Sequence, residues 1–108
     1  MPLLSFEQLS RQLPAPWQST LVGQVGPARI KVLRMDGQPY PEETHDANEG
    51  LLVTQGCLRL GVGQTVVEVA AGQMYLVEAG QAHSVLPGSH GTLVLIDIQP
   101  VPSLTQYR

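Results

Sequence analysis

Apolar and polar residues alternate along most of the chain after residue 19. The alternation is clearest at Leu58, Leu60 and Val62, where Arg59 faces the opposite side of an extended chain. This pattern predicts strands over residues 20–24, 28–35, 50–55, 57–62, 65–70, 74–77, 82–86 and 92–98. Glycines separate these segments, and turn signals recur about every 8–12 residues, which favours an all-β fold of the sandwich or barrel type.

The N-terminal segment has a helical periodicity instead. Residues 5–13 predict one short helix, because their apolar side chains share one face; these are Phe6, Leu9 and Leu13. Ser5 and Gln8 have the spacing of a capping box, and Pro14 is expected to end the helix. We therefore expect one short helix followed only by strands.

Composition supports a single folded domain. The chain has 108 residues, of which 43% are hydrophobic and 14% are charged, so it can fill a hydrophobic core. We expect one domain over residues 1–108. It comprises a helix and an arm at 1–19, a barrel at about 20–99 and an extended tail at 100–108.

Charge and cysteine content exclude several classes of protein. The net charge is −3 and the chain has one lysine, so nucleic acids and anionic membranes are poor candidate partners. No apolar run approaches the ~20 residues of a membrane span, and the N-terminus lacks the pattern of a signal peptide, so we expect a cytoplasmic protein. The single cysteine, Cys57, excludes an internal disulfide framework, and we expect it to be a small buried apolar residue.

The most unusual segment is the acidic stretch 42–49, which holds four of the nine acidic residues and one of the three histidines. Glu43 and His45 are two residues apart and would share one face of a strand. Glu49 has the parity of the core-facing apolar residues that follow it, and a buried carboxylate is costly unless it is paired or binds a cation. Two interpretations fit this stretch: an exposed acidic loop between strands, or part of a cation site.

Three other residues are candidates for a special role. His83 follows a turn at Gly80 and lies between two apolar strands, where a lone histidine is usually structural. His90 has the context of a turn tip and receives no role. Trp17 is interpreted as an anchor that packs the N-terminal segment.

The spacing of these residues matches two sequence motifs of one family. The first motif, G-x5-H-x-H-x3/4-E-x6-G, is reproduced in spacing by Gly37, Glu43, His45, Glu49 and Gly56, with Glu43 in place of the first histidine. The second, G-x5/7-P-x-G-x2-H-x3-N, is reproduced by Gly72, Glu78, Gly80, His83 and Pro87, with Glu78 for the proline and Pro87 for the asparagine. Over residues 28–98 the chain thus resembles the small single-domain cupins of the RmlC-like jelly-roll family. The resemblance implies a double-stranded β-helix, the jelly-roll barrel.

This resemblance also implies a metal site. The family's ligands fall on Glu43, His45, Glu49 and His83, which would converge inside the barrel, with Glu43 and His45 on one strand. Two imidazoles and two carboxylates leave a divalent ion formally neutral and favour hard ions such as Mn or Fe, while Ni or Zn could still occupy the site. The alternative is a metal-free pocket in which Glu43 bonds one of the histidines.

The expected barrel interior is mainly apolar; its residues are Leu51, Val53, Met74, Leu76, Leu93 and Leu95. Tyr40 is expected at the mouth and Glu78 on the surface, and no arginine is expected to face inward, which disfavours a strongly anionic substrate. We predict a small metal-binding monocupin that binds a small molecule in the barrel and forms a homodimer. The alternatives are a metal-dependent, dioxygenase-like enzyme acting on a small organic substrate, and a metal-free ligand-binding or structural cupin. The sequence does not decide whether the protein is an enzyme.

Overall fold

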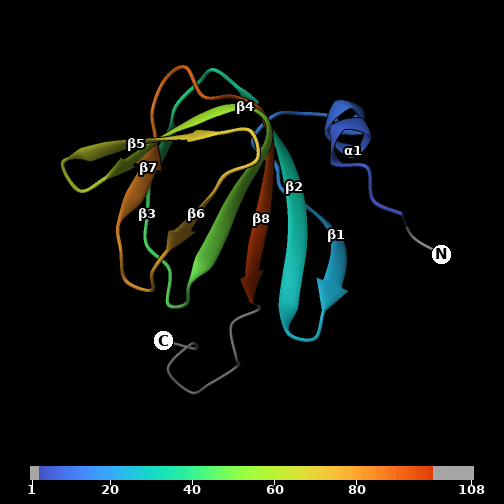
Figure 1. The fold of residues 1–108 in the computed structure, drawn as a ribbon, viewed down its shortest axis with the longest axis horizontal. Helices are drawn as coiled ribbons and strands as arrows, with labels where there is room; N and C mark the ends of the chain where they lie inside the picture. Colours follow the sequence, from blue (N-terminus) through green and yellow to red (C-terminus); the bar gives the residue numbers. More distant parts are fainter. Residues whose placement is uncertain (1–2, 99–108) are drawn as a thin grey trace.

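The structure of the protein is a computed structural model that describes residues 3–98. The predicted tail at 100–108 lies outside the described residues. One short helix, α1, precedes eight strands (Figure 1). Their bounds are α1 Phe6–Gln12, β1 Thr20–Val25, β2 Ala28–Asp36, β3 Tyr40–Glu43, β4 Glu49–Val62, β5 Thr65–Ala70, β6 Met74–Val77, β7 His83–Val85 and β8 His90–Ile98. Within residues 3–98, no helix has the length and hydrophobicity that crossing a membrane requires.

The strands form one antiparallel sheet that curls on itself, which confirms the all-β jelly-roll prediction. Its order is β1-β2-β8-β4-β7-β3, and β5 and β6 each pair with β4. β4 unites the two strands predicted at 50–55 and 57–62, and its two ends pair with different strands, β6 and β7. β3 was not among the strands predicted from periodicity, although the resemblance implied a strand that carries Glu43 and His45.

The curl depends on close contact between β4 and β8 at two glycines. Gly56 and Gly91 are register partners with φ values of 87° and 106°. A Cβ at Gly56 would lie 2.0 Å from the carbonyl oxygen of His90, and one at Gly91 would lie 2.0 Å from that of Gln55. Only glycine therefore fits either position.

The core lies inside the curled sheet. Its nine buried residues are Leu33, Met35, Leu51, Val53, Leu58, Leu60, Val69, Val77 and Leu93. The predicted inward parity of Leu58 and Leu60 is confirmed, because both are fully buried. The prediction for β6 is wrong: Met74 and Leu76 are 45% and 58% exposed. Leu76 pairs with Gly50, so it shares the outward face of β4, while Val77 is buried.

Helix α1 is fixed to β2 by a basic side chain. Arg34 donates hydrogen bonds to the carbonyl oxygens of Ser10 and Leu13, at 2.9 and 3.0 Å, and so satisfies acceptors at the helix C-terminus. The helix ends before Pro14, as predicted. The predicted capping box is wrong: Ser5 is the N-cap, but its side chain makes no capping hydrogen bond. Its carbonyl instead accepts the first helical bond, from the amide of Leu9.

Candidate metal centre

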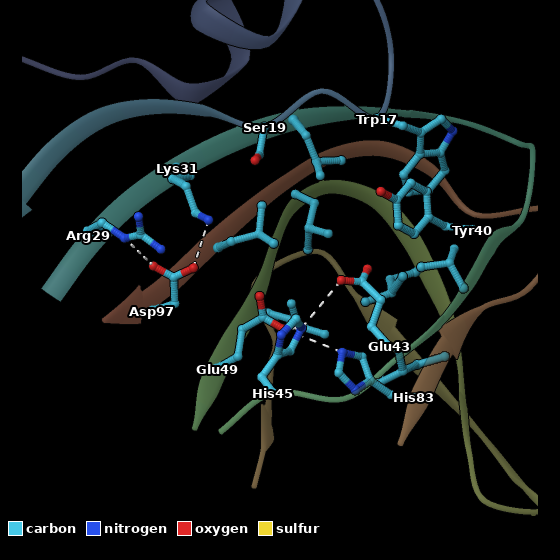
Figure 2. Close-up of a pocket in the computed structure, with 17 residues that line it drawn as sticks. Trp17, Ser19, Arg29, Lys31, Tyr40, Glu43, His45, Glu49, His83 and Asp97 are labelled. Carbon is cyan, nitrogen blue, oxygen red and sulfur yellow. Dashed lines mark hydrogen bonds and ion pairs between the residues drawn. The ribbon is translucent and has the colours of Figure 1, made fainter. Parts of the chain in front are cut away.

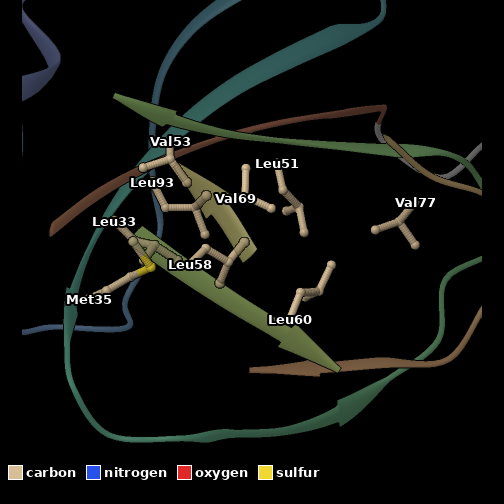
Figure 3. Close-up of a cluster of buried hydrophobic side chains, with 9 residues drawn as sticks. All are labelled: Leu33, Met35, Leu51, Val53, Leu58, Leu60, Val69, Val77 and Leu93. Atoms are coloured by element: carbon tan, nitrogen blue, oxygen red, sulfur yellow. The ribbon is translucent and has the colours of Figure 1, made fainter. Parts of the chain in front are cut away.

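A cavity of about 280 Å³ lies inside the curled sheet and is lined by side chains of β2, β3, β4, β7 and β8 (Figure 2). Its volume is close to the lower end of the ~300–1,000 Å³ range of small-molecule sites. Tyr40 lines it, as predicted. The apolar part of the wall belongs to the hydrophobic core, since Leu51, Leu60 and Leu93 are members of both (Figure 3).

Four sequence-predicted site residues meet at this cavity. Glu43 is the last residue of β3, Glu49 the first of β4 and His83 the first of β7. His45 lies in the loop between β3 and β4, so the prediction that Glu43 and His45 share a strand is wrong. β3 ends at Glu43, which pairs in register with His83.

The loop that carries His45 is tied to the turn before His83. The His45 carbonyl accepts a hydrogen bond of 2.8 Å from the amide of Gly80, and the Asn48 side chain accepts one of 2.9 Å from the amide of Ala79. Gly80 has a φ of 81°, a conformation that glycine adopts at no steric cost. These contacts bring the two histidines together, with ring centroids 5.2 Å apart.

Three of the four residues form a compact set of donor atoms. The Oε1 of Glu49 lies 3.5 Å from the Nε2 of both His45 and His83, and all three ligand atoms lie within 4.8 Å of one another. Metal–ligand bonds of about 2.0–2.2 Å place neighbouring donors about 3.0–3.5 Å apart, so the observed spacing fits a divalent ion. Glu43 is outside this compact set, although its Oε1 lies 3.5 Å from the Nε2 of His45.

Burial divides the cluster into an inner and an outer half. The side chains of His83 and Glu49 are 7% and 9% exposed, whereas those of His45 and Glu43 are 37% and 43% exposed. The predicted inward position of Glu49 is thus confirmed. Burial raises the pKa of Glu49, and Glu43 adds to this, while the nearby histidines oppose it. Glu42 and other parts of the stretch are exposed, so the solvated-loop interpretation fits only the segment's outer positions.

A hydrogen bond fixes the orientation of His83. Its Nδ1 lies 3.0 Å from the carbonyl oxygen of Gln81, which can only accept, so Nδ1 carries the proton. The other ring nitrogen, Nε2, then faces Glu49. This is the arrangement in which proteins hold a metal-ligating histidine.

The cavity has a charged wall that was not predicted. Arg29 and Lys31 of β2 and Asp97 of β8 line it, so the expectation of no inward-facing arginine is wrong. Asp97 is 2.9 Å from the Nε of Arg29 and 2.7 Å from the Nζ of Lys31. Burial raises the pKa of Asp97, but the hydrogen bonds and charges of these two residues outweigh it and hold the pKa below its usual value. The parity of Leu33 would have revealed both cations, because residues 29, 31 and 33 share one face.

Trp17 and Tyr40 form an aromatic pair at another part of the wall. Their rings stack with centroids 5.7 Å apart and an interplanar angle of 27°. Trp17 packs on the core, in agreement with the anchor interpretation, but its lining of the cavity was missed. Its indole Nε1 donates to the carboxylate of Asp36, and this bond is the main reason why the pKa of Asp36 is lowered.

The remaining candidates lie away from the cavity lining. His90 is exposed at the start of β8, and Glu78 is exposed as expected. Cys57 is half-buried rather than buried as predicted, because it alternates with the fully buried Leu58 and so faces the other side of β4. None of the three is among the residues that line the cavity.

Comparison with known proteins agrees with this architecture. A protein containing a cupin-2 domain from Shewanella frigidimarina has 17% identity and a TM-score of 0.82, over 90% of this chain and 95% of that chain. A Neisseria meningitidis protein has 17% identity and a TM-score of 0.78, over 91% and 100%. Hydroquinone 1,2-dioxygenase, solved with Cd²⁺ and 4-hydroxybenzonitrile, has 19% identity and a TM-score of 0.72, over 86% and 70%. These likenesses concern the fold alone.

Sequence comparison identifies the family. No curated protein is significantly similar in sequence to this chain. Residues 32–99, more than half of the chain, match the family model of the cupin domain, and this segment contains the cavity-lining residues of β3, β4, β7 and β8. The chain therefore belongs to the cupin family.

Proposed function

We propose that this protein is a small metal-binding monocupin that holds one divalent transition metal ion beside a cavity for a small molecule. The observation that carries the proposal is the convergence of His45, Glu49 and His83 from three segments, with all three ligand atoms within 4.8 Å. A buried carboxylate facing two imidazoles is a donor set that a divalent cation stabilises. Glu43 is the proposed fourth ligand, supported by its 3.5 Å distance from His45.

The chain's own residues determine what such a site can do. When bound, the ion would act as a Lewis acid toward a ligand in the cavity. The Gln81 carbonyl orients the His83 ring so that its Nε2 faces the cluster, and the exposed Glu43 carboxylate can accept a proton at the cavity side. Leu51, Leu60 and Leu93 give the cavity an apolar wall, which would favour the apolar part of a bound molecule over water. Two carboxylates favour Mn or Fe, while affinity alone rises toward Ni and Zn.

Calorimetric titration of the chelator-treated protein with MnCl₂ and with ZnCl₂ tests the proposal. We expect one binding site per chain in the wild type and none in the double variant His45→Ala/His83→Ala. His90→Ala is the matched control, because it removes a histidine that does not line the cavity. Equal binding by the wild type and the double variant would show that the assigned ligands are wrong.

A second candidate function is a dioxygenase-like activity on a small organic molecule. Its support is the cavity beside the cluster, together with the fold likeness to hydroquinone 1,2-dioxygenase. Oxygen uptake by the Fe²⁺-loaded and Mn²⁺-loaded protein with hydroquinone as the probe tests it. Metal binding without uptake favours a binding module, and absence of metal binding favours a metal-free cupin.

We also propose that the protein is a homodimer. The support is a row of exposed apolar residues on the outer side of the sheet, where Met74, Leu76 and Ile98 are 45%, 58% and 42% exposed. Together with Gly50 and Ile96 they line a shallow groove, and a second copy would remove it from water. A cytoplasmic location, and the lack of nucleic-acid and membrane partners, stay predictions.

A further inference from the structure

The inward face of the sheet changes from apolar to charged at one end of the cavity. On β2, the cavity-lining residues change from Leu33 to Lys31 and Arg29 toward the start of the strand. On the antiparallel strand β8 they change from Leu95 to Asp97 toward the end of the strand, next to Arg29. Lys31 is the only lysine of the chain. The side chains of Arg29, Lys31 and Asp97 are 25%, 19% and 16% exposed. Two cations therefore face one carboxylate in a partly desolvated wall, and one positive charge is in excess.

These cations retain hydrogen-bond donors that can serve a ligand. Arg29 contacts Asp97 through Nε, and within residues 3–98 its two terminal guanidinium nitrogens donate to no acceptor. Lys31 holds the second oxygen of Asp97 and has two further N–H groups. A guanidinium presents paired N–H donors that match the two oxygens of a carboxylate. The chemistry of this end of the cavity suits a small anion.

The aromatic pair lies on a different side of the cavity from the cations, and the metal cluster lies between the two along the remaining wall (Figure 2). Trp17 has a φ of 64°, a strained conformation for a residue with a large side chain. Its amide donates to the carbonyl of Arg34 at 3.0 Å, and its indole donates to Asp36. Strain held by surrounding bonds is a common property of ligand-contacting residues. Both aromatic rings line the cavity, and an aromatic wall suits a flat, apolar group.

Sheet register gives the position of the cations relative to the metal cluster. Arg29 pairs with Asp97, and Gly50 pairs with Ile96, so the start of β4 and Arg29 flank the same end of β8. Two strand spacings separate them, which is about 10 Å. A small molecule held by Arg29 and Lys31 would therefore lie within reach of an ion on Glu49.

We propose that the cavity binds a small planar organic acid with a single carboxylate. The carboxylate would contact Arg29 and Lys31, and the planar part would lie against Trp17 and Tyr40. This inference rests on the proposed function and names the class of small molecule that its cavity accepts. A single carboxylate matches the single excess positive charge of the Arg29–Lys31–Asp97 wall. The volume of about 280 Å³ limits the ligand to roughly one ring with its substituents.

A titration of the full-length, Zn²⁺-loaded protein followed by ¹H–¹⁵N NMR tests this inference, with benzoate and its neutral isostere benzamide as probes. We expect benzoate to bind at least about tenfold more tightly than benzamide, because hydrogen bonds to charged groups discriminate by this amount. Lys31→Met and Arg29→Gln should each weaken benzoate binding about tenfold or more. Arg11→Gln, which removes a positive charge from an exposed helical position, is the matched control and should change nothing. Trp17→Leu should weaken benzoate binding and leave acetate binding unchanged.

Separate outcomes address this inference and the proposed function. Zn²⁺ binding is measured first for each variant, and a variant that retains Zn²⁺ binding has a folded cavity. Lys31→Arg keeps the positive charge and should therefore retain benzoate binding. Equal affinity for benzoate and benzamide would overturn the inference. So would unchanged benzoate affinity in both charge variants, because the carboxylate would then sit on the metal. Benzoate binding by a protein that binds no Zn²⁺ would refute the proposed function alone.

Discussion

Replacing Glu43 or Glu49 by glutamine tests the outer and the inner half of the candidate site one at a time. Glu43→Gln and Glu49→Gln each remove one negative charge and keep the shape of the side chain. The two side chains differ in environment, because Glu43 is 43% exposed and Glu49 is 9% exposed. The two variants should therefore differ strongly in metal affinity.

The magnitudes follow from Coulomb's law. At about 4 Å, two unit charges attract by about 1 kcal/mol in water and about 4 kcal/mol at an effective dielectric constant of about 20. For a divalent ion these values double. Loss of the exposed Glu43 charge should then cost about 2 kcal/mol, or roughly 30-fold in affinity. Loss of the buried Glu49 charge should cost more than about 4 kcal/mol, or over a thousandfold, even after part of the attraction is offset by the cost of burying the carboxylate.

Calorimetric titration of the chelator-treated proteins with MnCl₂ measures both effects. Glu42→Gln is the matched control, because it removes the same charge from an exposed neighbour that does not line the cavity. We expect the order of affinities to be wild type and Glu42→Gln, then Glu43→Gln, then Glu49→Gln. Equal affinities for the two cluster variants, or a larger loss for Glu43→Gln, would refute the assignment of Glu49 as the central ligand.

Three further predictions concern stability and assembly. Gly56→Ala should lower the free energy of unfolding by about 3 kcal/mol or more, because the new Cβ would collide with the His90 carbonyl. Gly63→Ala, which has a positive φ but open space, should cost only about 1–2 kcal/mol, and equal losses in chemical denaturation would contradict the close β4–β8 contact. The folded-state pKa of Asp97 is lowered, so its stabilising contribution is present above the unfolded-state pKa of about 4 and is lost as pH falls through the folded-state pKa. The stability difference between the wild type and Asp97→Asn should thus shrink below about pH 4, and a difference that grows there would contradict the ion pairs. Light scattering should give a dimer mass for the wild type and a monomer mass for Leu76→Glu, and a monomeric wild type at micromolar concentration would exclude the proposed interface.

Periodicity predicted the parts of the fold that depend on local alternation. The inward parity of Leu58, Leu60 and Glu49 followed from a period of two and is correct. The same reasoning failed for Leu76, because the register of a short strand is set by its partner and a one-residue change moves every side chain to the opposite face. The motif spacing located the four cluster residues, but it did not show that His45 lies in a loop.

The charged and aromatic walls of the cavity were harder to predict. Arg29 and Lys31 could have been placed inward from the parity of Leu33, but a charged residue is ordinarily assigned to the surface. Their burial is tolerated because Asp97, distant in sequence, pairs with both. The position of Trp17 depends on a positive φ, which is rare for a bulky residue and leaves no signal in the sequence.

Elemental analysis of the untagged protein, purified without added metal or chelator, tests the central claim most directly. The wild type should carry close to one divalent transition metal ion per chain, and the double variant His45→Ala/His83→Ala, purified in parallel, should carry none. The ratio of the metal contents of the two samples distinguishes metal bound at the cluster from metal bound adventitiously elsewhere on the chain. A wild type without transition metal, or a double variant with the same content, would contradict the metal-binding account.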